Sequence, residues 1–86
     1  MHSVELTPTA EDVYEWLHKR DAKLFERVRT ILMSLGGDPV QGKPLKGELK
    51  GRFSFRLGAY RIIYRIVKAG KRVVILDIAH RRDVYR

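Results

Sequence analysis

Apolar residues in the first half of the chain recur at helical spacing and predict two helices. The first extends over residues 10–20, and Thr9 is placed to cap it. Its apolar face, at spacing i, i+3, i+4 and i+7, consists of Ala10, Val13, Tyr14 and Leu17. A short strand over residues 2–6 is predicted to precede this helix and to end at Thr7-Pro8, because proline restricts its own φ and that of the residue before it.

The second helix is predicted to follow almost without a loop. Asp21 can cap its start, and the run Gly36-Gly37-Asp38-Pro39 ends it. Its apolar face is formed by Leu24, Val28, Ile31, Leu32 and Leu35, with Phe25 beside it. Two helices joined so closely predict an αα-hairpin.

From Arg52 onward the pattern changes to alternation, which predicts strands. One side of the first strand is apolar, with Phe53, Phe55 and Leu57. The other side carries Arg52, Ser54 and Arg56. Gly58-Ala59 then predicts a two-residue turn of type II′, with glycine at its first central position.

This turn fixes the register of a hairpin. The apolar pairs that it places on the core side are Leu57 with Tyr60, Phe55 with Ile62 and Phe53 with Tyr64. On the opposite side it places Arg56 across from Arg61 and Arg52 across from Arg65. Like charges directly opposite cost about a few tenths of a kcal/mol per pair. Either the long side chains splay apart in solvent, or an anionic partner compensates.

A third strand is predicted from Arg72 to Ala79. Val74, Leu76 and Ile78 are uniformly apolar and are expected to face the helices. Asp77 and Arg81 would then share the face with the arginines, where Asp77 is expected to form an ion pair with Arg61 or Arg81. The segment 40–51, which contains three glycines and three lysines, is expected to be a loop.

Positive charge is concentrated in the last part of the chain. The net charge is +8, and residues 52–86 carry ten of the 18 lysines and arginines with only Asp77 and Asp83 as acids. Residues 1–42 carry five basic and seven acidic side chains. Such an asymmetry favours a polyanionic partner, and nucleic acid is the first candidate.

The composition also excludes several classes of protein. There is no cysteine, which excludes disulfides and thiolate metal sites. The three histidines, at positions 2, 18 and 80, have no metal-ligand spacing, so we expect no metal. Apolar runs are short and the N-terminus lacks the apolar core of a signal peptide, so we expect a cytoplasmic protein without membrane contact. At 86 residues, the chain is expected to form a single domain, residues 1–86.

Three stretches resemble the RelE/ParE superfamily of bacterial and archaeal toxins. They are the run Gly42-Lys43-Pro44-Leu45-Lys46-Gly47, the hairpin over residues 53–64 and the ending Ala79-His80-Arg81-Arg82-Asp83-Val84-Tyr85-Arg86. The resemblance implies an α+β fold, in which an N-terminal helical hairpin packs on a twisted, mainly antiparallel sheet of about four strands. It also implies membership of a toxin–antitoxin pair. The RelE branch cleaves mRNA in the ribosomal A site without a metal, and the ParE branch inhibits DNA gyrase.

The resemblance further implies a set of catalytic residues. By position these are Arg56, Arg61, Arg81 and Tyr85. The chain departs from the family pattern at Ser54, where the family usually has a second basic residue. Arg52 or Arg65 on the same face could substitute for that missing cation.

Elementary chemistry agrees with these residue types. Cleavage of RNA through its own 2′-hydroxyl needs a base, cations for the charge on the phosphorane and a proton for the leaving 5′-oxygen. Tyr85 can act as the base only if neighbouring cations lower its pKa, normally about 10. Alternatively, its ring anchors the chain end or stacks on a base.

His80 is the other group in the basic half that titrates near neutrality. It has the parity of Ile78, which places it on the helix side as a structural residue, whereas a break in the strand at Ala79 would free it to act as an acid or base. Further contacts to RNA are expected from Lys43, Lys46, Lys50, Arg52, Arg65 and Arg82.

Three functions are consistent with these features. The first is the toxin of a toxin–antitoxin pair, a ribosome-dependent and metal-independent mRNA endonuclease that needs no cofactor. Its partners would be a cognate antitoxin, the ribosome and mRNA. The alternatives are a ParE-type inhibitor of DNA gyrase, which is not a nuclease, and an RNA-binding module without catalysis.

Overall fold

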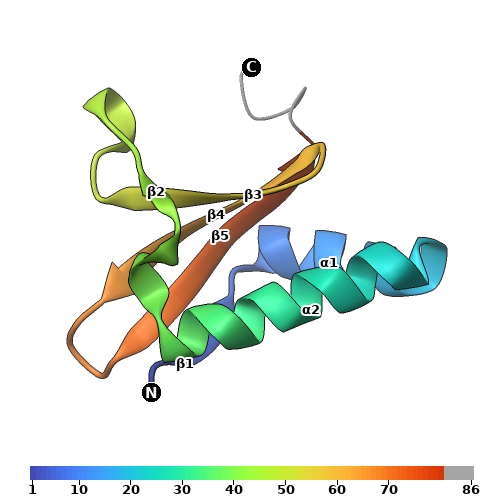
Figure 1. Cartoon of the computed structure of the whole chain (residues 1–86), viewed down its shortest axis with the longest axis horizontal. Coiled ribbons are helices and arrows are strands. Elements are labelled where there is room, and N and C mark those ends of the chain that lie inside the picture. Colours follow the sequence, from blue (N-terminus) through green and yellow to red (C-terminus); the bar gives the residue numbers. More distant parts are fainter. Residues whose placement is uncertain (81–86) are drawn as a thin grey trace.

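The computed structural model describes residues 1–80 and contains two helices and a five-stranded sheet in that range (Figure 1). The helices are α1 (Pro8–Arg20) and α2 (Ala22–Gly37). The strands are β1 (Ser3–Leu6), β2 (Lys43–Pro44), β3 (Arg52–Leu57), β4 (Tyr60–Val67) and β5 (Arg72–His80), in the spatial order β1-β5-β4-β3-β2. Short 3₁₀ helices occupy Pro39–Gln41 and Gly47–Leu49. The predicted α+β class, with a helical hairpin on a mainly antiparallel sheet, is confirmed.

The sheet has one strand more than expected. β2 lies inside the segment that was predicted to be a loop, and it pairs with β3 through Lys43 opposite Ser54 and Pro44 opposite Phe53. β1 lies parallel to β5, whereas the other pairs are antiparallel. Proline is tolerated in β2 because this strand is at the edge of the sheet.

The helix caps agree with the sequence at one position and differ at another. Asp21 caps α2 as predicted, and its carboxylate accepts a hydrogen bond from the Leu24 amide at 3.2 Å. The prediction of Thr9 as the cap of α1 is wrong. Thr7 caps that helix, and its Oγ1 accepts from the Ala10 amide at 3.3 Å. The helix therefore starts at Pro8, because the fixed φ of proline suits a first helical position.

The hairpin of β3 and β4 has the predicted register. Leu57 lies opposite Tyr60, Arg56 opposite Arg61 and Arg52 opposite Arg65. Gly58 has a φ of 59°, and Ala59 is not among the described residues with positive φ, which agrees with a type II′ turn.

The orientation of β5 was predicted only in part. Ile63 pairs with Asp77 and Tyr64 pairs with Ile75, so Leu76 is an extra residue that forms a bulge. The bulge reverses which side chains face the core in the part of β5 that precedes Leu76. As a result Val73 and Ile75 are fully buried, instead of Val74 and Leu76, while Ile78 is buried as predicted.

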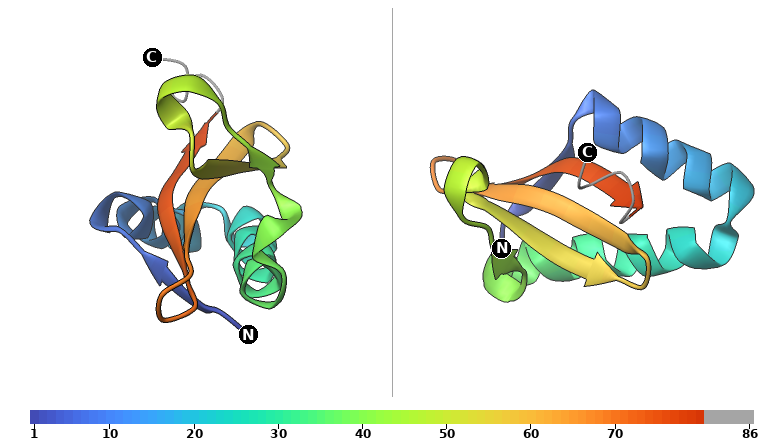
Figure 2. Two further views of the ribbon diagram at one scale, coloured as in Figure 1. Left: turned by 90° about the vertical axis from the view of Figure 1, so that its left-hand side faces the viewer. Right: turned by 90° about the horizontal axis from the view of Figure 1, so that it is seen from above.

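One core joins both helices to the sheet. Its buried members are Ala10, Leu17, Val28, Leu32, Leu35, Leu57, Ile62, Tyr64, Val73, Ile75 and Ile78. Seen from above, strands β3, β4 and β5 lie over the gap between the two helices (Figure 2). The opposite face of the sheet carries no helix in the described part of the chain, which leaves it open for function.

Candidate functional site

Four arginines project from the open face of the hairpin, and we call this surface the arginine face. Its members are Arg52 and Arg56 of β3 and Arg61 and Arg65 of β4. Arg52, Arg56 and Arg65 are exposed, whereas Arg61 is half-buried. The two pairs of like charges that the strand periodicity predicted are therefore present. Arg61 differs from the other three arginines because it is half-buried.

Arg61 is held against the sheet by Ser54. Its Nη1 donates a hydrogen bond to Ser54 Oγ at 3.2 Å. Ser54 is only 4% exposed, although its hydroxyl is polar. Arg56 is bound more loosely, through Nε to the Gly58 carbonyl at 3.4 Å.

A pocket of about 430 Å³ opens beside these side chains, and we call it the basic pocket. Its described lining consists of Gln41, Gly42, Lys43, Ser54, Phe55, Arg56 and Arg61. Three of these side chains are cationic and none is acidic. A concave surface with this charge favours an anion such as a phosphodiester, to which guanidinium groups can donate two hydrogen bonds at once.

The wall of the basic pocket is fixed from the core side. Tyr64 is fully buried, and its hydroxyl donates to the Pro39 carbonyl at 2.7 Å and accepts from the Gly42 amide at 2.9 Å. A Cβ atom at Gly42 would lie 2.6 Å from that hydroxyl, so only glycine fits there. Burial raises the pKa of Tyr64, and the charge of Asp38 adds to this, against the hydrogen bond from Gly42.

A second anchor holds the same segment at the end of α2. The Gln41 side-chain amide donates to the carbonyls of Ser34 and Asp38, both at 2.9 Å. Gln41, Gly42 and Tyr64 were not predicted to be parts of the site. The run Gly42-Lys43-Pro44 was the only local signal, and nothing in its spacing indicates that a tyrosine hydroxyl on β4 approaches it.

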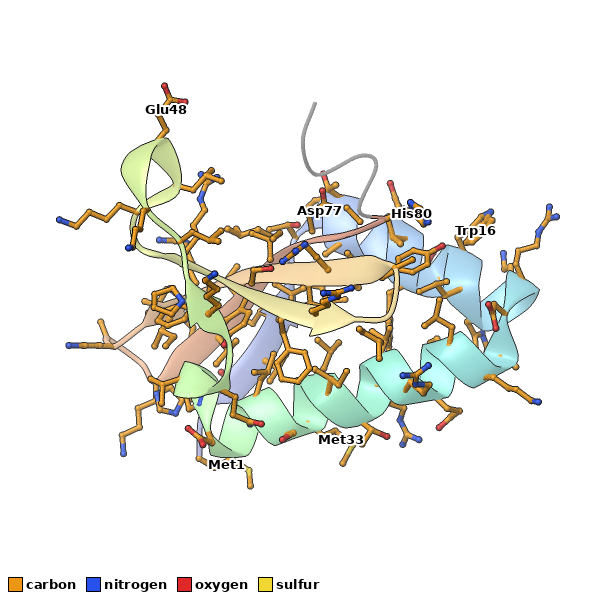
Figure 3. All side chains as sticks on the ribbon, turned by 45° about the horizontal axis from the view of Figure 1, so that its top comes forward. Met1, Trp16, Met33, Glu48, Asp77 and His80 are labelled. Atoms are coloured by element: carbon orange, nitrogen blue, oxygen red, sulfur yellow. The ribbon has the colours of Figure 1, made fainter. Side chains whose placement is uncertain are left out.

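The other predicted lysines lie on a separate part of the surface. Lys43 lines the basic pocket, whereas Lys46 and Lys50 are exposed on the segment that projects beyond β2. Glu48 marks the tip of this projection (Figure 3). Arg81, Arg82 and Tyr85 lie outside the described residues.

Asp77 and His80 belong to a different pocket, of about 490 Å³. It is lined by Asp12, Val13, Trp16, Tyr60, Asp77, Ile78, Ala79 and His80. His80 lies near Trp16 of α1 (Figure 3) and contacts the Tyr60 ring edge-on, with centroids 5.4 Å apart. It therefore faces the helix side, as its parity predicts.

The expected ion pair between Asp77 and Arg61 is wrong. Within residues 1–80 the ion pairs are Arg29 with Glu26 and Arg72 with Glu5. Asp77 lies opposite Ile63 on β4, whereas Arg61 lies opposite Ala79 and donates through Nη1 to Ser54. The alternative partner, Arg81, lies outside the described residues.

The described residues contain neither a metal-binding cluster nor a membrane-spanning helix. No group of three or more histidines, cysteines or acids could hold a metal ion in residues 1–80. No helix of that range is long and apolar enough to cross a membrane.

Known proteins are similar to this chain over nearly its whole length. The family described as "ParE toxin of type II toxin-antitoxin system, parDE" matches residues 4–85. Toxin RelG of Mycobacterium tuberculosis is 40% identical over 87 residues, which cover 99% of this chain and 97% of that protein.

Solved structures show the same architecture. The toxin chain matched in the RelBE2 toxin–antitoxin complex of Mycobacterium tuberculosis has a TM-score of 0.79 and 37% identity, over 92% of this chain and 96% of that chain. The YoeB/ParE toxin of Agrobacterium tumefaciens has a TM-score of 0.83 and 25% identity, over 91% and 96% of the two chains. The family match over residues 4–85 thus extends over both helices and over strands β2 to β5.

Proposed function

This chain belongs to the ParE toxin family of type II toxin–antitoxin systems, and we propose that it is a toxin of the RelE type that cleaves mRNA on the ribosome without a metal ion. One observation carries the proposal. Lys43, Arg56 and Arg61 line one pocket that has no acidic side chain among its described residues, and Arg61 is fixed there by a hydrogen bond. Such a pocket is suited to charge that develops on a phosphodiester.

The reaction would use the substrate's own nucleophile. The 2′-oxygen of the ribose attacks the adjacent phosphorus, and the bond from phosphorus to the 5′-oxygen breaks. The leaving 5′-oxygen takes up a proton from solvent, so the products are a 2′,3′-cyclic phosphate and a 5′-hydroxyl. Arg61 and Arg56 would stabilise the extra negative charge of the phosphorane, since guanidinium groups donate paired hydrogen bonds to phosphate oxygens.

We assign proton transfer to Tyr85 and a supporting positive charge to Arg81. A tyrosinate can accept the proton of the 2′-hydroxyl if cations lower its pKa, and Arg81, Arg82 and Arg86 adjoin it in the sequence. His80 is the other candidate, but its ring contacts Tyr60 on the helix side of the sheet. This arrangement supports Tyr85 over His80.

The remaining basic residues would hold RNA by charge. Arg52 and Arg65 lie on the arginine face, where flanking phosphates would pass, and Lys46, Lys50 and Arg82 would contact further phosphates of mRNA or ribosomal RNA. A ribosome would supply what a small pocket cannot, namely a substrate held in line for attack.

A cognate antitoxin is the third proposed partner. The structural relatives include toxin–antitoxin complexes. We expect the antitoxin to bring carboxylates to the arginine face and to bury apolar surface as well, with a segment that folds on binding.

A second candidate function rests on Ser54. The absence of a basic residue at this position leaves room for a ParE-type inhibitor of DNA gyrase, which needs no cationic active site. An RNA-binding module without catalysis would use the same charges and perform no chemistry.

Cleavage of mRNA on programmed ribosomes tests the proposal. Purified protein should cut the message at all Mg²⁺ concentrations that keep ribosomes intact, at a rate that does not follow Mg²⁺, and should leave a 2′,3′-cyclic phosphate. Naked RNA should be cut poorly, because it is not held in line. Inhibition of gyrase supercoiling without any cleavage would instead support the ParE-type alternative, and RNA binding without either activity would support the binding module.

A further inference from the structure

Ser54 lines the basic pocket together with three cationic side chains and is itself uncharged. It pairs with Lys43 on β2 and with Ile63 on β4, and it lies two residues from Arg56 on the same face of β3. It is nevertheless 4% exposed, whereas Arg52 and Arg56 on the same strand and face are exposed. A buried hydroxyl in this place needs an explanation, because buried polar groups are retained where they form specific hydrogen bonds.

We propose that Ser54 is a positioning residue, whose hydroxyl fixes the Arg61 guanidinium in the basic pocket. The inference rests on the proposed function for its catalytic consequence and on the geometry for the contact itself. Ser54 Oγ accepts from Arg61 Nη1 at 3.2 Å, and Arg61 is the one half-buried member of the arginine face.

Electrostatics explains why Arg61 needs this anchor. Arg56 lies directly opposite Arg61 in the hairpin, so the two guanidinium groups repel each other. A hydroxyl oxygen that accepts from Arg61 offsets part of this repulsion, and burial limits the water that would otherwise compete. Hydrogen bonds to charged groups are among the stronger ones in proteins.

A basic side chain at position 54 would enter a pocket that is already cationic. Ser54 is 4% exposed and lies opposite Lys43, so a lysine there would add a fourth cation beside Lys43, Arg56 and Arg61. The basic pocket thus has one cation fewer than the family pattern implies, and Ser54 instead holds Arg61 in place. A donor that is already oriented stabilises a transition state without reorganisation.

A double-mutant cycle tests the catalytic role. Ser54→Ala should lower the single-turnover rate of cleavage on ribosomes by about 10- to 100-fold, the range expected for one hydrogen bond to a charged group, with little change in KM. In an Arg61→Ala background the same substitution should have no further effect. Ser54→Thr, which keeps the hydroxyl, should retain most of the rate, and Ser3→Ala is the matched control on an exposed strand position.

Equal losses from Ser54→Ala in both backgrounds would overturn the inference, because the serine would then act independently of Arg61. Melting temperatures of all variants separate this result from misfolding. If Ser54→Ala proves unstable, Ser54→Thr and Ser54→Cys, which differ in the strength of the acceptor, provide the same comparison.

A measurement that needs no activity tests the contact alone. Nitrogen NMR of the Arg61 side chain should show slower rotation about the Nε–Cζ and Cζ–Nη bonds in the wild type than in Ser54→Ala, since a hydrogen bond restrains the group. Unchanged rotation would overturn the positioning role. If the wild type cuts no mRNA, the proposed function fails while this measurement still decides whether Ser54 fixes Arg61.

Discussion

On the helix side of the β3–β4 hairpin the side chains are fixed by packing, whereas on the arginine face most of them are exposed. Ile62 and Tyr64 are fully buried, and Leu57 is 7% exposed. One residue away along the same strands, Arg52, Arg56 and Arg65 extend into solvent. Packing imposes one geometry on the first set, while the second set is ordered only where a polar contact holds it.

The basic pocket is an exception to this contrast, because hydrogen bonds fix one of its arginines and its wall. Arg61 is held by Ser54, and the pocket wall is held by Tyr64, a core residue whose hydroxyl reaches the carbonyl of Pro39 and the amide of Gly42. The core therefore fixes part of the site directly. This comparison indicates which substitutions should affect activity, which should affect stability and which should affect both.

The largest effect on the cleavage rate is expected from substitution of Tyr85, which is not part of the hairpin. Tyr85→Phe should lower cleavage by about 10²–10⁴ if its hydroxyl is the general base. Single-turnover rates on programmed ribosomes measure this, with Tyr85→Ala for comparison. A near-normal rate for Tyr85→Phe together with an inactive Tyr85→Ala would show that the ring stacks, and His80 would become the next candidate for the base.

Arg61→Ala should have the next largest effect. Removal of one donor to the transition state typically lowers the rate by about 10²–10³. Arg65→Ala removes the same charge from an exposed position of the same strand and should lower the rate much less, since Arg65 is not among the described residues that line the basic pocket. Equal losses in the two variants would mean that net charge matters and the pocket geometry does not.

The sequence predicted the face of the hairpin correctly because Gly58-Ala59 fixes the register of strands that alternate. It did not predict the parity of β5, because residues 73–76 are all apolar and carry no alternation that would reveal the bulge at Leu76. The pocket wall was also missed, since it depends on a tyrosine hydroxyl 22 positions from Gly42. Contacts of this kind arise from packing of the whole chain, and no local pattern encodes them.

Salt should separate the two partners of the arginine face. If about four phosphates are neutralised, affinity for single-stranded RNA should fall with a log–log slope near −3, about 0.7 per phosphate. The antitoxin complex should lose much less affinity, because part of its interface is apolar. Titrations of a noncleavable RNA and of the antitoxin over the same salt series measure both slopes, and equally steep slopes would show that charge alone holds the antitoxin.

Tyr64→Phe should have a smaller effect on catalysis and a clear effect on stability. It removes the donor to Pro39 and the acceptor for Gly42 in a largely buried place, which typically costs about 1–3 kcal/mol of the free energy of unfolding. Because the wall that carries Lys43 would loosen, cleavage should also fall, though by less than in Arg61→Ala. Urea unfolding monitored by circular dichroism measures the stability.

The dependence of stability on pH sharpens this last comparison. Burial raises the pKa of Tyr64 above its ordinary value of 10.0, because the loss of solvent disfavours the charged phenolate. The stability from this group is therefore fully present below pH 10 and is lost as the pH rises through the higher pKa of the folded state. Wild type should lose more stability than Tyr64→Phe over that range. Tyr14→Phe is the matched control, since burial raises the pKa of Tyr14 as well. It should leave the contribution of Tyr64 in place. A Tyr64→Phe variant that loses as much stability at high pH as the wild type would show that folding does not raise the pKa of Tyr64.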